Sequence, residues 1–129
     1  MKIRMKGNSL RLRVGRSELA RFLEDGYIDE TIHFAAAPVA SFTCTLEVAP
    51  QSDRATTVRY KPCEVGVVLT PEQVRLWQRD DQVGIYTHID LGAGRTLEII
   101  VEKDFACLDG SDSLDTFDNP NEAASRRIG

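Results

Sequence analysis

Hydrophobic and polar residues alternate along much of the first half of the chain, which predicts a series of short strands. The alternation runs through residues 2–6, 10–14, 27–34 and 41–48. A period of two places the hydrophobic side chains on one face of a strand and the polar ones on the other. Gly7-Asn8 separates the first two stretches and suits the tight turn of a hairpin.

The spacing changes to that of a helix between the second and third strands. Ser17 is a suitable N-cap, Leu19 and Phe22 follow three positions apart, and Gly26 suits the position after a helix. Residues 3–48 are therefore predicted to form a strand–strand–helix–strand–strand unit.

The same pattern returns 55 residues later, with no gap needed in the alignment. Leu12 then corresponds to Val67, and Phe22 on the first helix corresponds to Trp77. The hydrophobic strand positions match in phase, whereas a shift by one residue would put each set on the wrong face. This match predicts a second unit over residues 58–103.

The second predicted helix has the clearer start. Thr70 and Gln73 have the spacing of a capping box, and Pro71 occupies the first helical position. Gly92-Ala93-Gly94 then forms the turn between the last two strands, because no helix follows it as a dinucleotide-binding loop would require.

Each predicted unit is too small to bury a good core alone, so we expect the two to share one. The expected fold is mainly β (α+β), with both units forming one pseudo-twofold swapped-hairpin or barrel-like domain over residues 1–103. Residues 49–57 are the expected linker. Residues 104–129 are an acidic tail that we expect to be partly disordered.

Composition narrows the class of protein. The chain has 129 residues, of which 42% are hydrophobic and 28% charged, as in folded soluble proteins. No stretch approaches the roughly 18–20 apolar residues of a membrane span, and early charges such as Lys2 and Arg4 argue against a secretory signal. Three widely spaced cysteines fit a reducing compartment, so we expect a cytoplasmic protein.

Charge is distributed unevenly between the two ends of the chain. Residues 1–21 carry seven cations against Glu18, and residues 102–122 carry seven anions against Lys103. This polarity suggests an anionic partner for the head, a cationic partner for the tail, or the tail lying on the head. Two solvated surfaces are the remaining alternative.

The first hairpin concentrates the positive charge. Five of its cations share one face, where like charges opposite each other are destabilising, so an anion is expected there. The candidates are nucleic-acid phosphate, the acidic tail, and a neighbouring strand that carries an acid such as Glu47 or Glu98. With two flanking residues, the candidate anion-binding set is Lys2, Arg4, Lys6, Asn8, Arg11, Arg13 and Arg16.

The sequence contains no motif that establishes a reaction, a metal site or a cofactor. His33 and His88 occupy equivalent positions but lack a third ligand nearby. Cys107 lies between carboxylates, which raise a thiol pKa and argue against a nucleophile. Cys44 is expected in the core and Cys63 in a loop. We therefore predict no cofactor, no metal and no enzymatic activity.

The segment Lys6-Gly7-Asn8-Ser9-Leu10-Arg11-Leu12-Arg13-Val14, with the helix and strand after it, resembles the swapped-hairpin domains of the AbrB/MazE type. That resemblance implies an intramolecular pseudo-dimer and DNA binding through the basic hairpins. In the antitoxin members it also implies an acidic tail that wraps a toxin. The whole chain, especially residues 101–109, also resembles a small bacterial family of unknown function.

Two features depart from the AbrB/MazE pattern. Val14-Gly15 stands where a proline usually follows the second strand, and Lys61-Pro62-Cys63-Glu64 replaces the Gly-Asn-Ser turn in the second unit. At most one hairpin therefore keeps the basic character, and a palindromic DNA site would require two chains, as in a homodimer.

We predict a binding protein, similar to transcription regulators, that contacts DNA or another polyanion with its first hairpin. The alternative is a protein-interaction module whose tail docks on a basic protein. Its predicted partner-binding residues are Asp104, Phe105, Asp109, Asp112, Asp115 and Phe117. A small enzyme that uses His33, His88 or residues 104–109 is the third alternative.

Overall fold

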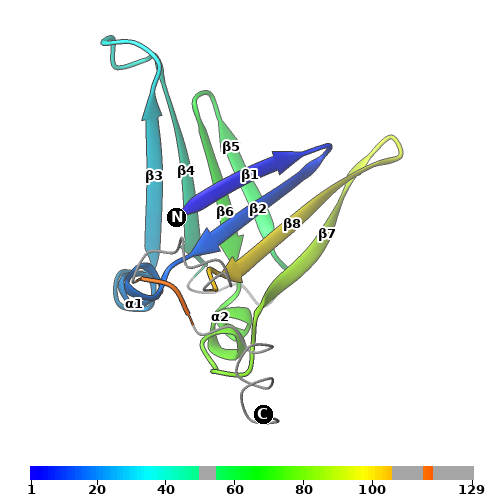
Figure 1. Ribbon diagram of the computed structural model, residues 1–129. Coiled ribbons are helices and arrows are strands. Elements are labelled where there is room, and N and C mark those ends of the chain that lie inside the picture. Colours follow the sequence, from blue (N-terminus) through cyan, green and yellow to red (C-terminus); the bar gives the residue numbers. More distant parts are fainter. Residues whose placement is uncertain (50–54, 106–114, 118–129) are drawn as a thin grey trace, which may run out of the picture.

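The computed structural model describes residues 1–49, 55–105 and 115–117, which contain eight strands and two helices. The first half contains β1 (Lys2–Lys6), β2 (Ser9–Val14), α1 (Arg16–Asp25), β3 (Tyr27–His33) and β4 (Ser41–Val48). The second half repeats this order with β5 (Thr57–Lys61), β6 (Glu64–Leu69), α2 (Pro71–Trp77), β7 (Gly84–Gly92) and β8 (Arg95–Lys103) (Figure 1). The predicted order of elements is confirmed, with β5 starting one residue earlier than expected.

Each of the two sheets is assembled from one hairpin of each half. The strand order is β1-β2-β8-β7 in the first sheet and β3-β4-β6-β5 in the second. Within each sheet the two hairpins meet through a parallel pair at the centre, β2 with β8 and β4 with β6. The predicted swapped-hairpin, pseudo-twofold fold is therefore confirmed.

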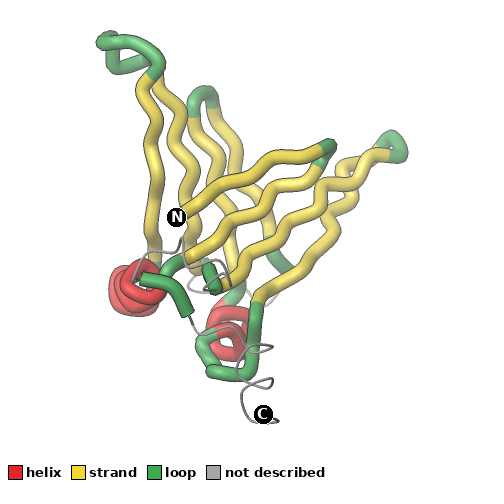
Figure 2. The backbone as a smooth tube through the Cα atoms, in the orientation of Figure 1, coloured by secondary structure: helices red, strands yellow, loops and turns green. Residues whose placement is uncertain are grey.

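The sheets meet at one end of the molecule and separate toward the other. Both helices lie at the end where the sheets meet, and the four hairpin turns point away from it (Figures 1 and 2). In the part of the chain that the structure describes, no helix has the length and apolar character needed to cross a membrane.

The repeat is strict in the first hairpin of each half and relaxed in the second. β1 and β5 begin 55 residues apart, as do β2 and β6. Glu47 pairs with Tyr27, whereas its equivalent, Glu102, pairs with Gly84, two residues beyond the position that a strict repeat would give. Because the difference is two residues, side chains keep their predicted faces.

The core lies between the two sheets and is lined by equivalent pairs from the two halves. The buried pairs are Leu12 with Val67, Val14 with Leu69, Cys44 with Ile99, Leu46 with Val101, and Phe22 with Trp77. The rings of Phe22 on α1 and Trp77 on α2 meet edge to face with centroids 6.3 Å apart. The predicted burial of Leu12, Val67 and the two helix aromatics is confirmed.

The two helices begin differently. In α2 the predicted capping box is present: the Thr70 hydroxyl accepts from the Gln73 amide at 3.0 Å, and the Gln73 side chain accepts from the Thr70 amide at 2.9 Å. In α1 the predicted N-cap Ser17 is wrong, because Gly15 holds that position and the helix starts at Arg16.

A segment from the tail supplies the missing cap of α1. The Asp115 carboxylate accepts from the Ser17 amide and hydroxyl, both at 2.8 Å, and its carbonyl accepts from the Arg16 amide at 2.8 Å. Glycine at position 15 leaves room for this contact, since an added Cβ would lie 2.9 Å from the Asp115 carbonyl oxygen. The tail contacts the head here, at the start of α1.

Candidate anion-binding face

Five cationic side chains of β1 and β2 lie on the outer face of the first sheet, which we call the basic face. In the β1–β2 ladder Lys2 is opposite Arg13, and Arg4 is opposite Arg11. The residues between them, such as Leu12, turn to the core, so these cations must point outward. The basic face consists of Lys2, Arg4, Lys6, Arg11 and Arg13.

Acidic groups of the chain neutralise one end of the basic face. Glu102 on β8 accepts from Arg13 Nε at 3.1 Å and lies 3.4 Å from Arg11 Nε. Lys2 Nζ lies 2.8 Å from an Asp104 carboxylate oxygen. This end of the face is therefore held by internal ion pairs.

The acids expected beside the basic hairpin, Glu47 and Glu98, are not the ones that neutralise it. Glu47 lies in the other sheet, and Glu98 is aligned with Ser9 near the hairpin turn. The exchange of hairpins makes β8 the neighbour of β2, and β8 brings Glu102 to the arginines. The 55-residue repeat could have identified this residue, because Glu102 is the repeat equivalent of Glu47.

The other end of the basic face has no such partner. Among the described residues, Arg4 and Lys6 form no ion pair. Glu98 lines a neighbouring depression with Lys6, but no ion pair joins the two side chains. Arg4, Lys6, Ser9, Arg11 and Ile100 line a depression of about 170 Å³. At roughly 30 Å³ per atom, as in liquid water, this space holds about five or six non-hydrogen atoms, the size of a phosphate group.

The equivalent positions of the second sheet are neutralised within the chain. Arg59, which corresponds to Arg4, donates to Glu47 at 2.5 Å and to Glu64 at 2.6 Å. Lys61, which corresponds to Lys6, lies 3.3 Å from Glu64. Ser9 occupies the position of Glu64 in the first half, so the acid that would neutralise Arg4 and Lys6 is missing there.

Both acids that accept hydrogen bonds from Arg59 are stabilised in the charged form. Hydrogen bonds from Arg59 lower the pKa of Glu64. Burial alone would raise the pKa of Glu47, but hydrogen bonds from Arg59 and Thr45 outweigh burial and lower it. The second sheet thus contains a satisfied charge network where the first sheet leaves cations available.

Two predicted anion-binding residues lie outside the basic face. Asn8 is at the tip of the first hairpin, and its side-chain amide donates to the Thr96 carbonyl at 2.8 Å. Arg16 begins α1, and its guanidinium lies 5.0 Å from the centroid of the Phe117 ring. The structure therefore brings together five of the seven predicted residues.

The described residues of the predicted partner-binding tail contact the chain itself. Asp104 pairs with Lys2, Asp115 caps α1, and Phe105 and Phe117 meet edge to face at 6.2 Å. Asp109 and Asp112 lie outside the described residues. Binding of a basic protein by the tail stays a prediction.

The weaker candidates are not brought together. His33 lies on the second sheet and His88 on the first, and no group of three or more metal-binding side chains occurs among the described residues. Cys44 is buried, as expected, and burial raises the pKa of its thiol to about 11. Cys63 is exposed in the β5–β6 turn, and Cys107 lies outside the described residues.

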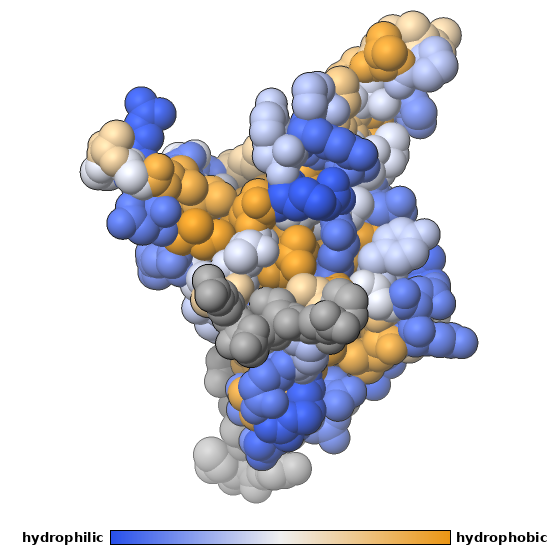
Figure 3. Space-filling view, turned by 180° about the vertical axis from the view of Figure 1, so that it is seen from behind, coloured by the Kyte–Doolittle hydropathy of each residue, from blue (hydrophilic) through white to orange (hydrophobic). Residues whose placement is uncertain are grey.

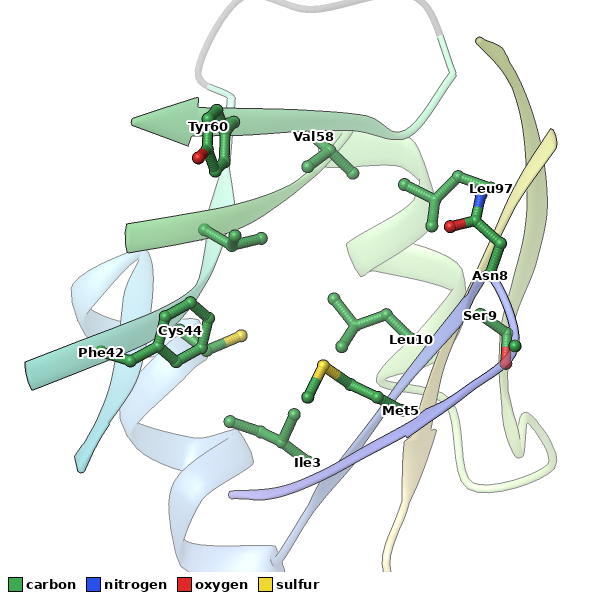
Figure 4. Close-up of a pocket in the computed structure, with 12 residues that line it drawn as sticks. Ile3, Met5, Asn8, Ser9, Leu10, Phe42, Cys44, Val58, Tyr60 and Leu97 are labelled. Atoms are coloured by element: carbon green, nitrogen blue, oxygen red, sulfur yellow. The ribbon is translucent and has the colours of Figure 1, made fainter. Parts of the chain in front are cut away.

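A second feature, which the sequence did not indicate, is an apolar pocket of about 300 Å³ between the open ends of the two sheets. Side chains from both sheets point toward one another across it (Figure 4). Four equivalent pairs line it: Ile3 with Val58, Met5 with Tyr60, Leu10 with Val65, and Phe42 with Leu97. The sequence pattern assigns all eight to the buried face, whereas the separation of the sheets leaves Met5 and Tyr60 each 75% exposed. Hydrophobic residues gather between the hairpin arms in Figure 3.

Comparison with known proteins gives the family and no activity. The model of a family of unknown function, DUF7009, matches residues 1–121. The chain belongs to this family. No curated protein and no solved structure matches the chain. The expected resemblance to a small family of unknown function is thus confirmed, and the basic face and the apolar pocket are the features from which a function must be inferred.

Proposed function

We propose that the protein binds nucleic acid through the phosphate backbone, with the basic face as the contact surface. The observation that carries the proposal is the difference between equivalent positions. Arg4 and Lys6 have no acidic partner among the described residues, whereas Arg59 and Lys61 are paired with Glu47 and Glu64. A chain that needed these cations only for folding would be expected to neutralise both sheets in the same way.

The chemistry of the basic face suits phosphate. Lysine and arginine provide most protein contacts to nucleic-acid phosphates, and such contacts position the protein without specifying sequence. The depression beside Arg4, Lys6 and Arg11 is large enough to admit a phosphate group. Arg11 Nε lies 3.4 Å from Glu102, which also accepts from Arg13 Nε at 3.1 Å, so Arg11 can turn to a phosphate while Glu102 keeps Arg13 as its partner.

The proposal covers backbone binding and a regulatory role of the kind that the AbrB/MazE resemblance implies. Because one hairpin per chain carries the available cations, recognition of a palindromic site would require two chains. We therefore propose a homodimer as the form that binds such a site and a binding role in place of a catalytic one.

The test is a titration of full-length protein against a fluorescent 30-base-pair duplex, followed by anisotropy at several salt concentrations. We expect affinity to fall steeply with salt, because each phosphate contact adds about one to the slope of log affinity against log salt. Scrambling the duplex sequence should change affinity little if phosphate contacts dominate. Absence of binding at low salt, or binding that salt does not weaken, would overturn the proposal.

A further inference from the structure

The edge strand β1 has three distinct sides, and each presents groups that could contact a partner molecule. Its inner side carries Ile3 and Met5 at the apolar pocket, and its outer side carries Arg4 and Lys6. Its free edge is the third side, because β1 ends the strand order of its sheet and no described strand pairs with it there. All five residues of β1 are exposed.

Backbone groups of β1 point along this free edge. Lys6 and Ser9 close a two-residue turn and so form a hydrogen-bonded pair of the β1–β2 ladder. Such pairs alternate with pairs whose N–H and C=O groups point away from the partner strand. Ile3 and Met5 therefore direct their backbone groups to the edge, where an extended chain could accept and donate hydrogen bonds.

We propose that β1 takes up an extended peptide from a partner protein as an additional strand, with hydrophobic and acidic residues alternating along the peptide. Strand addition of this kind draws affinity from backbone hydrogen bonds and specificity from the side chains on alternate positions. Hydrophobic side chains would enter the pocket beside Ile3 and Met5. Acidic side chains would lie on the opposite face, near Arg4 and Lys6.

The size and chemistry of the pocket support this occupant. About 300 Å³ holds roughly ten non-hydrogen atoms at 30 Å³ each, which matches two or three aliphatic side chains. Two polar side chains at the pocket are already engaged, since Asn8 donates to the Thr96 carbonyl and the Ser9 hydroxyl donates to the Lys6 carbonyl at 2.6 Å. The pocket therefore offers apolar contact, and the charge complementarity comes from the other face of β1.

Contacts at the N-terminal end of β1 limit where such a strand can lie. The N-terminal ammonium group contacts the carboxylates of Glu18 on α1 and Glu30 on β3, which ties β1 to the second sheet at that end. The added strand would therefore run along residues 3–6, toward the open hairpin turn. On β5 the cations Arg59 and Lys61 are already paired, so the equivalent edge offers no such charge complementarity.

A synthetic peptide tests the proposal on the full-length protein. The probe alternates Glu and Leu over seven residues. One control has the same composition with the leucines in one block, and another is N-methylated at alternate residues to remove donors along one edge. We expect the probe to bind at least tenfold more tightly than either control and to slow amide hydrogen exchange at Ile3 and Met5.

Two protein variants locate the site. Met5→Lys places a charge at the pocket and should weaken probe binding at least tenfold, whereas Leu91→Lys makes the same change at an exposed residue outside the pocket and should leave binding unchanged. Both should keep the melting temperature and duplex-DNA binding, which separates this proposal from the proposed function.

Other outcomes would overturn the proposal. Equal binding of the block peptide would show nonspecific attraction. No binding of any peptide would show that the free edge of β1 accepts no added strand, as expected if its cations protect it from pairing. Protection of the Ile3 and Met5 amides without peptide would show that another occupant is already present. Protection that rises with protein concentration would then identify a second copy, and protection independent of concentration would identify a segment of the same chain.

Discussion

Arg4 and Arg59 occupy equivalent positions in the two halves of the molecule, yet only Arg59 is enclosed by acidic side chains. Arg59 donates to Glu47 and Glu64, whereas Arg4 is opposite Arg11 on the neighbouring strand. The duplication thus places one backbone arrangement in two electrostatic settings. In the second sheet the cation is neutralised by acids of the chain, and in the first sheet positive charge is left available to a ligand.

The ion-pair network around Arg59 depends on a glycine at position 66. An added Cβ at Gly66 would meet Thr45 Oγ1 at 2.7 Å and Arg59 Nη2 at 2.9 Å, as well as the Glu47 carboxylate. We expect Gly66→Ala to displace the Arg59 guanidinium and to lower the melting temperature. The loss should be smaller when Gly66→Ala is made together with Arg59→Ser, because the crowded guanidinium is then absent. Equal losses in both backgrounds, measured by thermal denaturation, would contradict this coupling.

The contact between the two helices should dominate the stability of the shared core. Phe22 and Trp77 are each 1% exposed and meet edge to face, so Phe22→Ala should cost about 3–5 kcal/mol of unfolding free energy. Because the two rings contact each other, the double replacement with Trp77→Ala should cost less than the sum of the single ones. Urea denaturation measures all three, and strict additivity would show that the two rings act independently.

Docking of the tail on α1 should depend on pH. Hydrogen bonds from Ser17 hold the pKa of Asp115 below its ordinary value. A carboxyl group whose pKa is lowered in the folded state stabilises that state at pH values above its ordinary pKa. The stabilisation is lost as the pH falls through the lowered pKa. The Asp115 contact should therefore be fully formed at neutral pH, begin to weaken below about pH 4, the ordinary carboxyl range, and be lost as pH falls through the lowered pKa. The amide chemical shift of Ser17 reports it, and Asp115→Asn should remove most of its acid dependence. A shift that titrates unchanged in that variant would exclude Asp115 as the cause.

The two described cysteines should differ in reactivity. Burial raises the pKa of the Cys44 thiol to about 11, whereas Cys63 is exposed. At pH 8 the thiol of Cys44 should react with a disulfide reagent only after denaturation, because the thiolate is the reactive form. In a Cys107→Ser background we expect one fast thiol in the native protein and two in denaturant. Two fast thiols in the native protein would show that the core opens readily at β4.

The repeat could be predicted from the sequence because a period of two fixes which face of each strand is buried. Leu12 and Val67 follow from that pattern alone, as does the basic face, since Arg4 and Arg11 alternate with buried positions. The cap of α1 could not be predicted, because Asp115 is about 100 residues away from Ser17 in the sequence and no local spacing connects them. The pocket was also hidden: Met5 and Tyr60 have the spacing of buried residues, and only the separation of the sheets leaves them exposed.

The acids that neutralise the basic face could be predicted only in part. The alternating pattern indicates that an anion lies near the basic hairpin, with Glu47 or Glu98 among the candidates. The residue found there is Glu102, and its identification depends on which strand pairs with β2. That pairing is set by the exchange of hairpins between the two halves. Once the exchange is known, the 55-residue repeat identifies Glu102 and also shows that Ser9 replaces the acid equivalent to Glu64.

The most direct test of the central claim compares two double variants that remove the same charge from equivalent strands. Arg4→Ser with Lys6→Ser removes two cations from β1, and Arg59→Ser with Lys61→Ser removes two from β5. In duplex-DNA titrations at several salt concentrations, the β1 variant should bind weakly and lose up to about two from the log–log slope. The β5 variant should keep the wild-type slope, since its cations are already paired with Glu47 and Glu64. Equal losses in the two variants, with both still folded, would show that net charge and not the basic face of the first sheet governs binding.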